Sequence, residues 1–124
     1  MKKFVAHEIN GYWARDIDVW VDRRLKTMPY AQAGVVLRDG KAVLMSYSTE
    51  AATLDTVEGW LTIDCMCSAT TRRHVSAFLK EYCPGVSYYD AKAAFTGGYA
   101  INVYTGDHMD RETGEILNAD QLTA

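Results

Sequence analysis

Short stretches with strand-like patterns of apolar and polar side chains dominate the first half of the chain. Asp39-Gly40 lies between the first two of these stretches, residues 33–37 and 41–47. This dipeptide favours a tight hairpin because type I′ turns need positive φ at both central positions. Glu58-Gly59 separates the last two in the same way. The pattern therefore predicts an antiparallel meander of about four strands, over residues 33–37, 41–47, 50–57 and 60–67.

The apolar spacing changes from a strand period to a helix period after Ser68. Four apolar side chains then recur at i, i+3, i+4 and i+7, which places them on one helix face: Val75, Phe78, Leu79 and Tyr82. Thr70 or Thr71 is expected to cap the start of this helix. Cys83-Pro84-Gly85 is expected to end it. The pattern predicts a helix over about 70–82.

Weaker patterns lie on both sides of this unit. Residues 16–22 alternate and predict a strand with Ile17, Val19 and Val21 inward, with a short helix over 16–26 as the alternative. Ser87 is expected to cap a second short helix over 88–95, before a strand over 99–104. The predicted fold class is α+β, with an antiparallel sheet of about four to six strands and one main helix packed on one face.

Composition agrees with an ordinary globular domain. The 124 residues are 48% hydrophobic and 23% charged, which excludes a largely disordered chain. No apolar run approaches the roughly 20 residues needed to cross a bilayer. The start Met-Lys-Lys-Phe-Val-Ala-His-Glu has charge but no apolar stretch, so we expect no export signal and a cytoplasmic location.

Charge is distributed unevenly along the chain. Residues 106–124 have a net charge of −4, whereas the rest has +1. We expect a globular domain over 1–105 and an acidic end over 106–124 that forms a short hairpin or is partly mobile. This profile is not that of a general nucleic-acid binder, and it favours a basic protein partner. The candidate acidic contact residues are Asp107, Asp110, Glu112 and Glu115.

The three cysteines do not indicate a metal site. Cys65 and Cys67 are two residues apart in a predicted strand, so both side chains are expected on one face. With Cys83 they are interpreted as buried, reduced thiols, because free cysteine behaves as a small hydrophobe. Zinc would need a fourth ligand and a wider spacing than Cys-x-Cys. The sequence therefore predicts neither a metal nor a cofactor.

The predicted helix start contains an unusual group of cations. A helix N-terminus has partial positive charge and open N–H groups, so it favours anions over arginine. One interpretation is a phosphate or carboxylate site, whose residues would be Thr70, Thr71, Arg72, Arg73 and His74. A second is compensation of the arginines by Asp64 or Glu58. A third is structural, with the threonines capping the helix and His74 bonding back to the corner.

The same stretch bears a resemblance to other proteins. Ser46-Tyr47-Ser48-Thr49 and the later Ser68-Ala-Thr-Thr-Arg-Arg-His74 with Phe78 resemble a loose family of small phage and mobile-element proteins. The family pattern is Ser-Tyr-x-Thr, then Tyr-Ser-x-Thr-Thr-x-x-His with a phenylalanine four residues later, and the match covers 43–82. Cys67 and Glu50 depart from it, where the family has an aromatic and a proline or small residue. The resemblance implies a mobile-element origin and no particular activity.

No catalytic motif is found, so the chain is predicted not to be an enzyme. We expect an accessory protein of a phage or mobile element that binds a protein partner, such as an inhibitor of a host defence protein (a CRISPR-type system, for example) or of a nucleic-acid-processing protein. The alternative is a nucleic-acid or nucleotide-binding module that uses the anion site at the helix start. Several tyrosines could stack on bases, but packing within the sheet is the expected role of most.

Overall fold

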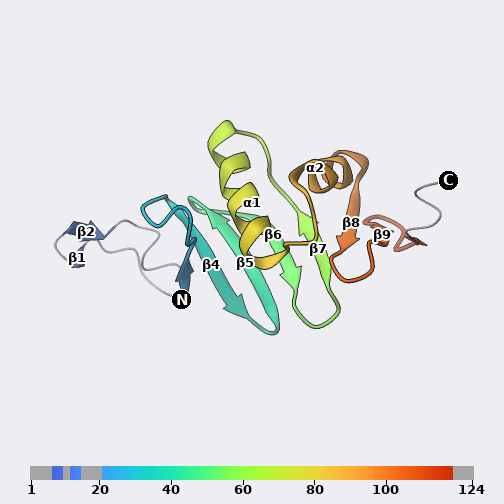
Figure 1. Cartoon of the computed structure of the whole chain (residues 1–124), viewed down its shortest axis with the longest axis horizontal. Coiled ribbons are helices and arrows are strands. Elements are labelled where there is room, and N and C mark those ends of the chain that lie inside the picture. Colours follow the sequence, from blue (N-terminus) through green and yellow to red (C-terminus); the bar gives the residue numbers. More distant parts are fainter. Residues whose placement is uncertain (1–6, 10–11, 15–20, 119–124) are drawn as a thin grey trace.

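The computed structural model describes residues 7–9, 12–14 and 21–118, and it has an α+β fold (Figure 1). Two helices and an eight-stranded antiparallel sheet form its body, and the sheet order is β10-β9-β8-β7-β6-β5-β4-β3. A separate antiparallel pair is formed by β1 (His7–Ile9) and β2 (Tyr12–Ala14). The main strands are β3 (Arg23–Arg24), β4 (Ala33–Arg38), β5 (Lys41–Ser46), β6 (Thr49–Asp55), β7 (Trp60–Ile63), β8 (Tyr99–Asn102), β9 (His108–Asp110) and β10 (Ile116–Leu117).

The central hairpins follow the sequence prediction closely. Asp39 and Gly40 have φ of 49° and 74°, and Arg38 pairs with Lys41 across the turn. These positive φ values at both central residues are those of the predicted tight turn. Tyr47 also has positive φ, at 55°, in the turn between β5 and β6, and no glycine marks that turn in the sequence.

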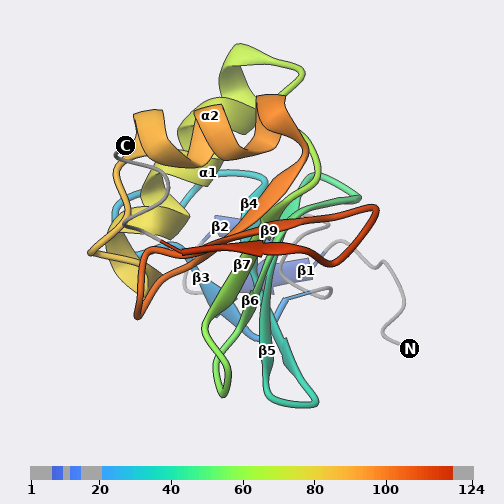
Figure 2. The same cartoon turned by 90° about the vertical axis from the view of Figure 1, so that its right-hand side faces the viewer.

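Two helices cover one face of the sheet. Helix α1 (Ala69–Tyr82) packs over β5 and β6, and α2 (Tyr88–Gly97) packs over β7 and β8. Figure 2 shows both helices above the same side of the sheet. The predicted helix over 70–82 is confirmed, with its apolar stripe in the core. Helix α2 ends at Gly98, whose φ of 80° is the left-handed value that glycine adopts without strain.

The main core lies between the helices and the sheet. Its largest fully buried side chains include Leu25, Leu44, Leu61, Phe78 and Leu79. Val43 and Met45 alternate with Leu44 along β5, so they point to the opposite face, where they form a smaller cluster with Val21.

The sheet is larger than the four to six strands predicted. Strands β3, β9 and β10 have only two or three residues each, too few to show any periodicity. They become strands through pairing with a neighbour. The strand predicted over 16–22 lies mostly outside the described residues, although Val21 is buried as expected. Of the acidic end, residues 108–117 contain β9 and β10, and 119–124 lie outside the described residues.

The strand predicted over 60–67 is shorter than expected. Leu61 and Ile63 are buried as predicted, but β7 ends at Ile63 because the chain then leaves the sheet toward α1. The alternation shifts at that point. Met66 enters the core with 7% exposure, whereas Cys67 is exposed. The prediction of an inward, buried side chain is therefore wrong for Cys67, whereas Cys65 is half-buried and packs against the main core.

Candidate functional site

The start of α1 is held by Ser68 rather than by a threonine. Ser68 has an extended backbone, and its Oγ accepts a hydrogen bond from the Thr71 N–H at 3.0 Å. Neither Thr70 nor Thr71 is the N-cap, because the helix begins earlier, at Ala69. Arg72 and Arg73 thus occupy the fourth and fifth helical positions. The unfavourable effect of the helix dipole on them is smaller there, because it falls off within the first turn.

A chain of hydroxyl groups, buried except for Ser68, connects this helix start to the sheet. Ser68 donates to Thr71 Oγ1 at 3.0 Å, and Thr71 Oγ1 lies 3.1 Å from Ser46 Oγ at the end of β5. Ser46 Oγ lies 2.8 Å from His74 Nδ1. If each hydroxyl donates once along this chain, His74 Nδ1 accepts and its proton is on Nε2. His74 was predicted to bond back to the corner at the helix start; it contacts Ser46 of β5 instead, and reaches the helix start only through the Ser46–Thr71 contact.

His74 is therefore a structural residue in this part of the chain. Its side chain and that of Ser46 are each 1% exposed. Burial, with a smaller effect of the nearby Arg73 charge, lowers the pKa of His74 below its usual value of 6.5. A serine hydroxyl on a neutral imidazole is the geometry of a nucleophile and its base. Here no substrate can reach it, because both groups are enclosed.

The predicted anion-site residues are consequently divided. Thr71 and His74 are buried and face the core, and Thr70 is half-buried. Arg72 is half-buried and Arg73 is exposed, and both line a cavity of about 280 Å³. We call this cavity the α1–α2 groove, and it is lined by Ala69, Arg72, Arg73, Ser76 and Tyr88.

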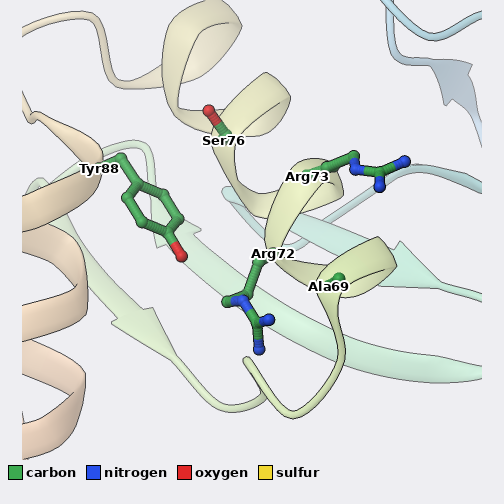
Figure 3. A pocket seen from close by; sticks show the side chains of 5 residues that line it. All are labelled: Ala69, Arg72, Arg73, Ser76 and Tyr88. Carbon is green, nitrogen blue, oxygen red and sulfur yellow. The ribbon is translucent and has the colours of Figure 1, made fainter.

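Of the two arginines that line the groove, Arg72 lies nearer to Tyr88 on the opposite wall. Figure 3 shows the Tyr88 ring extending from α2 with its hydroxyl directed toward Arg72. Arg73 extends to the other side of α1, away from Tyr88 (Figure 3). Arg72 Nη1 donates one hydrogen bond, to the Met66 carbonyl at 3.2 Å. Among the described residues this is the one hydrogen bond recorded for the guanidinium, which has five N–H groups in total.

The compensating acids expected from the sequence are not beside these arginines. Asp64 pairs instead with Arg111, whose Nη2 lies 2.6 Å from Asp64 Oδ1. Glu58 is in the turn before β7 and contacts neither arginine among the described residues. The first turn of α1 also contains no acidic residue. In the described part of the chain, Arg72 and Arg73 thus have no carboxylate partner.

The four acidic candidates lie in or beside the hairpin formed by β9, β10 and their turn, which we call the acidic hairpin (residues 107–117). Asp110 Oδ1 accepts from the N–H groups of Thr113 and Glu112, and these bonds lower the pKa of Asp110. Its carboxylate therefore serves the turn. Glu112 and Glu115 are exposed. Arg111 fastens the hairpin to β7 through Asp64 and through the Ile63 carbonyl at 3.0 Å.

The structure does not bring the two predicted sites together. Tyr88, in the groove, is the first residue of α2, whereas the acidic hairpin lies beside Gly97 and Gly98 at its other end. A ten-residue helix is about 15 Å long. Sequence reasoning missed the parts played by Ser46 and Tyr88, and no local pattern indicates that either residue would face α1.

Several tyrosines are more exposed than expected. Tyr47, Tyr89 and Tyr104 are 52%, 79% and 66% exposed, so packing is not the main role of these three. Tyr104 nevertheless donates from its hydroxyl to the Thr56 carbonyl at 2.8 Å.

In the described residues, no three His, Cys, Asp or Glu side chains gather to hold a metal ion. No helix in that part is long and apolar enough to cross a membrane.

Comparison with known proteins gives a family for this chain. The chain belongs to the family of unknown function DUF8033, whose model matches residues 22–96. This stretch runs from just before β3 to the end of α2, so it includes the α1–α2 groove and excludes the acidic hairpin. The comparisons with curated proteins and with solved structures gave no match.

Proposed function

We propose that this protein is a non-enzymatic binding module that holds a phosphate group of a nucleic acid in the α1–α2 groove. The observation that carries the proposal is Arg72, which lines the groove opposite the Tyr88 hydroxyl and pairs with no carboxylate among the described residues. An arginine without an acidic partner, next to a hydroxyl donor, is suited to phosphate recognition.

The size of the groove indicates what part of a ligand it takes. Its volume of about 280 Å³ lies just below the range of pockets that enclose whole small molecules. It accommodates one phosphate group of a larger, otherwise external ligand. Arg73, on the other side of α1, adds positive charge near the same helix start, where it would contact a neighbouring phosphate of an extended strand.

Two further observations support a binding role rather than catalysis. The Ser46–His74 pair, which has the geometry of a catalytic dyad, is 1% exposed at both residues. The groove itself is lined by arginine, tyrosine, serine and alanine, and its lining includes no histidine, aspartate or glutamate.

The test is fluorescence anisotropy with a labelled, 5′-phosphorylated single-stranded oligonucleotide. Arg72→Gln should weaken binding about ten- to a hundredfold, because a charged hydrogen-bonded contact contributes roughly 1.5–3 kcal/mol. It should also reduce the slope of log K against log salt by about 1. Arg73→Gln should have a smaller effect on affinity.

Lys80→Gln is the matched control, because it removes one positive charge from the exposed last turn of the same helix. It should leave affinity within about twofold of the wild type, which is about 0.4 kcal/mol. Equal losses for Lys80→Gln and Arg72→Gln would show general electrostatic attraction and contradict a groove site. Binding unaffected by Arg72→Gln would refute the proposal outright.

A second candidate function rests on the acidic hairpin. Glu112 and Glu115 are exposed on a hairpin that Arg111 fastens to the sheet, so their charges are presented in a defined place. We propose this surface for a basic protein partner, as in an inhibitor of a host defence or nucleic-acid-processing protein of phage or mobile-element origin acting in the cytoplasm. Glu112→Lys with Glu115→Lys should abolish recovery of that partner in affinity purification from the native host. Unchanged recovery would contradict this role.

A further inference from the structure

The link between β7 and α1 contains two thiols in contact. Cys65 and Cys67 flank Met66, whose side chain is buried in the main core. The Cys65 side chain also packs against this core. Cys65 Sγ and Cys67 Sγ are 2.7 Å apart. Cys65 is half-buried and Cys67 is exposed.

We propose that Cys65 and Cys67 form a redox-active dithiol, which an external low-molecular-weight disulfide converts reversibly into an intramolecular disulfide. A disulfide bond is about 2.05 Å long, so the two sulfurs need to approach by only about 0.7 Å. Because Met66 is anchored in the core between them, the contact is maintained by the fold. Two thiols held in contact and open to solvent on one side are suited to thiol–disulfide exchange.

The exchange proceeds in two steps. The Cys67 thiolate, which is the more accessible, attacks one sulfur of glutathione disulfide; a protein–glutathione mixed disulfide forms and one glutathione thiolate leaves. Cys65 then loses its proton to solvent, and its thiolate attacks Cys67 Sγ and displaces the second glutathione thiolate. The protein loses two electrons and two protons, and one glutathione disulfide is reduced to two glutathiones.

The third cysteine provides an internal reference. Cys83 is 1% exposed, and burial raises the pKa of its thiol to about 12. A thiol in that state is unreactive, because only the thiolate attacks disulfides. The hydrogen bond with Cys65 raises the pKa of the Cys67 thiol, an effect that the charge of Arg72 partly opposes. The exchange should accordingly become faster as the pH rises above neutral.

Arg72 of the α1–α2 groove contacts the backbone between the two cysteines, because its Nη1 donates to the Met66 carbonyl. The proposal does not depend on what the groove binds. It concerns the oxidation state of Cys65 and Cys67, which is measured without any ligand.

The experiment is incubation of the full chain, in buffer with a metal chelator, with glutathione disulfide and glutathione at a series of ratios. The products are trapped by alkylation, digested with trypsin and analysed by mass spectrometry. Peptide 42–72 contains both Cys65 and Cys67, and peptide 81–92 contains Cys83. We expect peptide 42–72 to lose the mass of two hydrogens and to take up no alkyl group, and peptide 81–92 to remain a thiol. Reduction with dithiothreitol should restore both thiols.

Single variants identify the order of attack. Cys65→Ser should accumulate a stable glutathione adduct on Cys67, because no second thiol can displace the glutathione. Cys67→Ser should react more slowly, because the remaining sulfur is half-buried. A stable adduct on Cys67 in the wild-type chain, with Cys65 still alkylated, would overturn the proposal. So would the recovery of both thiols at every ratio, and neither result requires the variants to fold.

Discussion

The buried hydroxyl chain gives the sharpest stability prediction, through Ser46→Ala. Ser46 Oγ is 1% exposed and lies within hydrogen-bond distance of Thr71 Oγ1 and His74 Nδ1. Its removal leaves His74 Nδ1 without its partner, and a buried unsatisfied group costs about 1–3 kcal/mol. Thr71 Oγ1 keeps its bond from Ser68, so its loss is smaller. We expect a total decrease of about 2–4 kcal/mol in the free energy of unfolding.

The assay is urea unfolding followed by far-UV circular dichroism, with the m-value unchanged if only stability is affected. In thermal unfolding the same change corresponds to a decrease in Tm of roughly 6–16 °C for a chain of this size. Ser48→Ala is the control, because Ser48 lies in the adjacent turn and is exposed. This variant should change the free energy of unfolding by less than about 0.5 kcal/mol.

A double-mutant cycle tests whether the Ser46 and Thr71 hydroxyls act as one network. Thr71→Val keeps the side-chain shape and removes Oγ1, and its effect should not add to that of Ser46→Ala. Residues in one hydrogen-bond network usually show a coupling of about 0.5–3 kcal/mol. A Ser46→Ala variant as stable as Ser48→Ala would show that the Ser46 hydroxyl contributes no stability. Simple additivity with Thr71→Val would show that the two hydroxyls are not coupled in one network. Either result would refute the prediction.

Three other predictions follow from single contacts. The pKa of His74 is lowered in the folded protein, so as the pH decreases the unfolded chain takes up this proton before the folded chain does. The free energy of unfolding should therefore fall below about pH 6.5, by at most about 1.4 kcal/mol per pH unit. His74→Gln should flatten this part of a profile of urea midpoint against pH. Gly59→Ala should lower stability by about 2 kcal/mol or more in thermal unfolding, because φ is +91° and the added Cβ would lie 2.5 Å from the Tyr104 ring. Gly114→Ala, with φ of +77° and open space around it, should cost only about 1 kcal/mol, and equal effects would contradict the steric argument. Asn102→Ala should cost about 2–4 kcal/mol by chemical unfolding, because this buried amide makes three hydrogen bonds to backbone groups; a loss below about 0.5 kcal/mol would disprove that estimate.

The elements that the sequence predicted well are those whose physics is local. Asp39-Gly40 determines the β4–β5 turn because both residues tolerate positive φ. The helix over 70–82 was predicted almost to its ends, since its apolar spacing and the Pro84-Gly85 stop lie within the segment itself. Ser68 as the cap was missed by a few residues, because several hydroxyl side chains compete there and only the backbone conformation selects one.

The missed elements are those that depend on distant partners. Strand β3 is too short to have a period, and its backbone groups are satisfied only by pairing with β4. Strands β9 and β10 were predicted only as one of two alternatives for the acidic end, a short hairpin, because they too are short and depend on their neighbours. The strand predicted through Cys67 stops at Ile63 for a similar reason, because the chain must leave the sheet to place α1 over its face. No pattern within these segments contains that information.

The fold class, the central meander, the main helix and the two arginines near its start could all be read from local sequence patterns. Tertiary structure alone decided what surrounds those arginines. It paired Asp64 with Arg111, brought Ser46 to His74 across 28 residues of chain, and placed Tyr88 opposite Arg72. The physical reason is that an ion pair or a groove depends on contacts between separate elements, which form only when the sheet and helices pack.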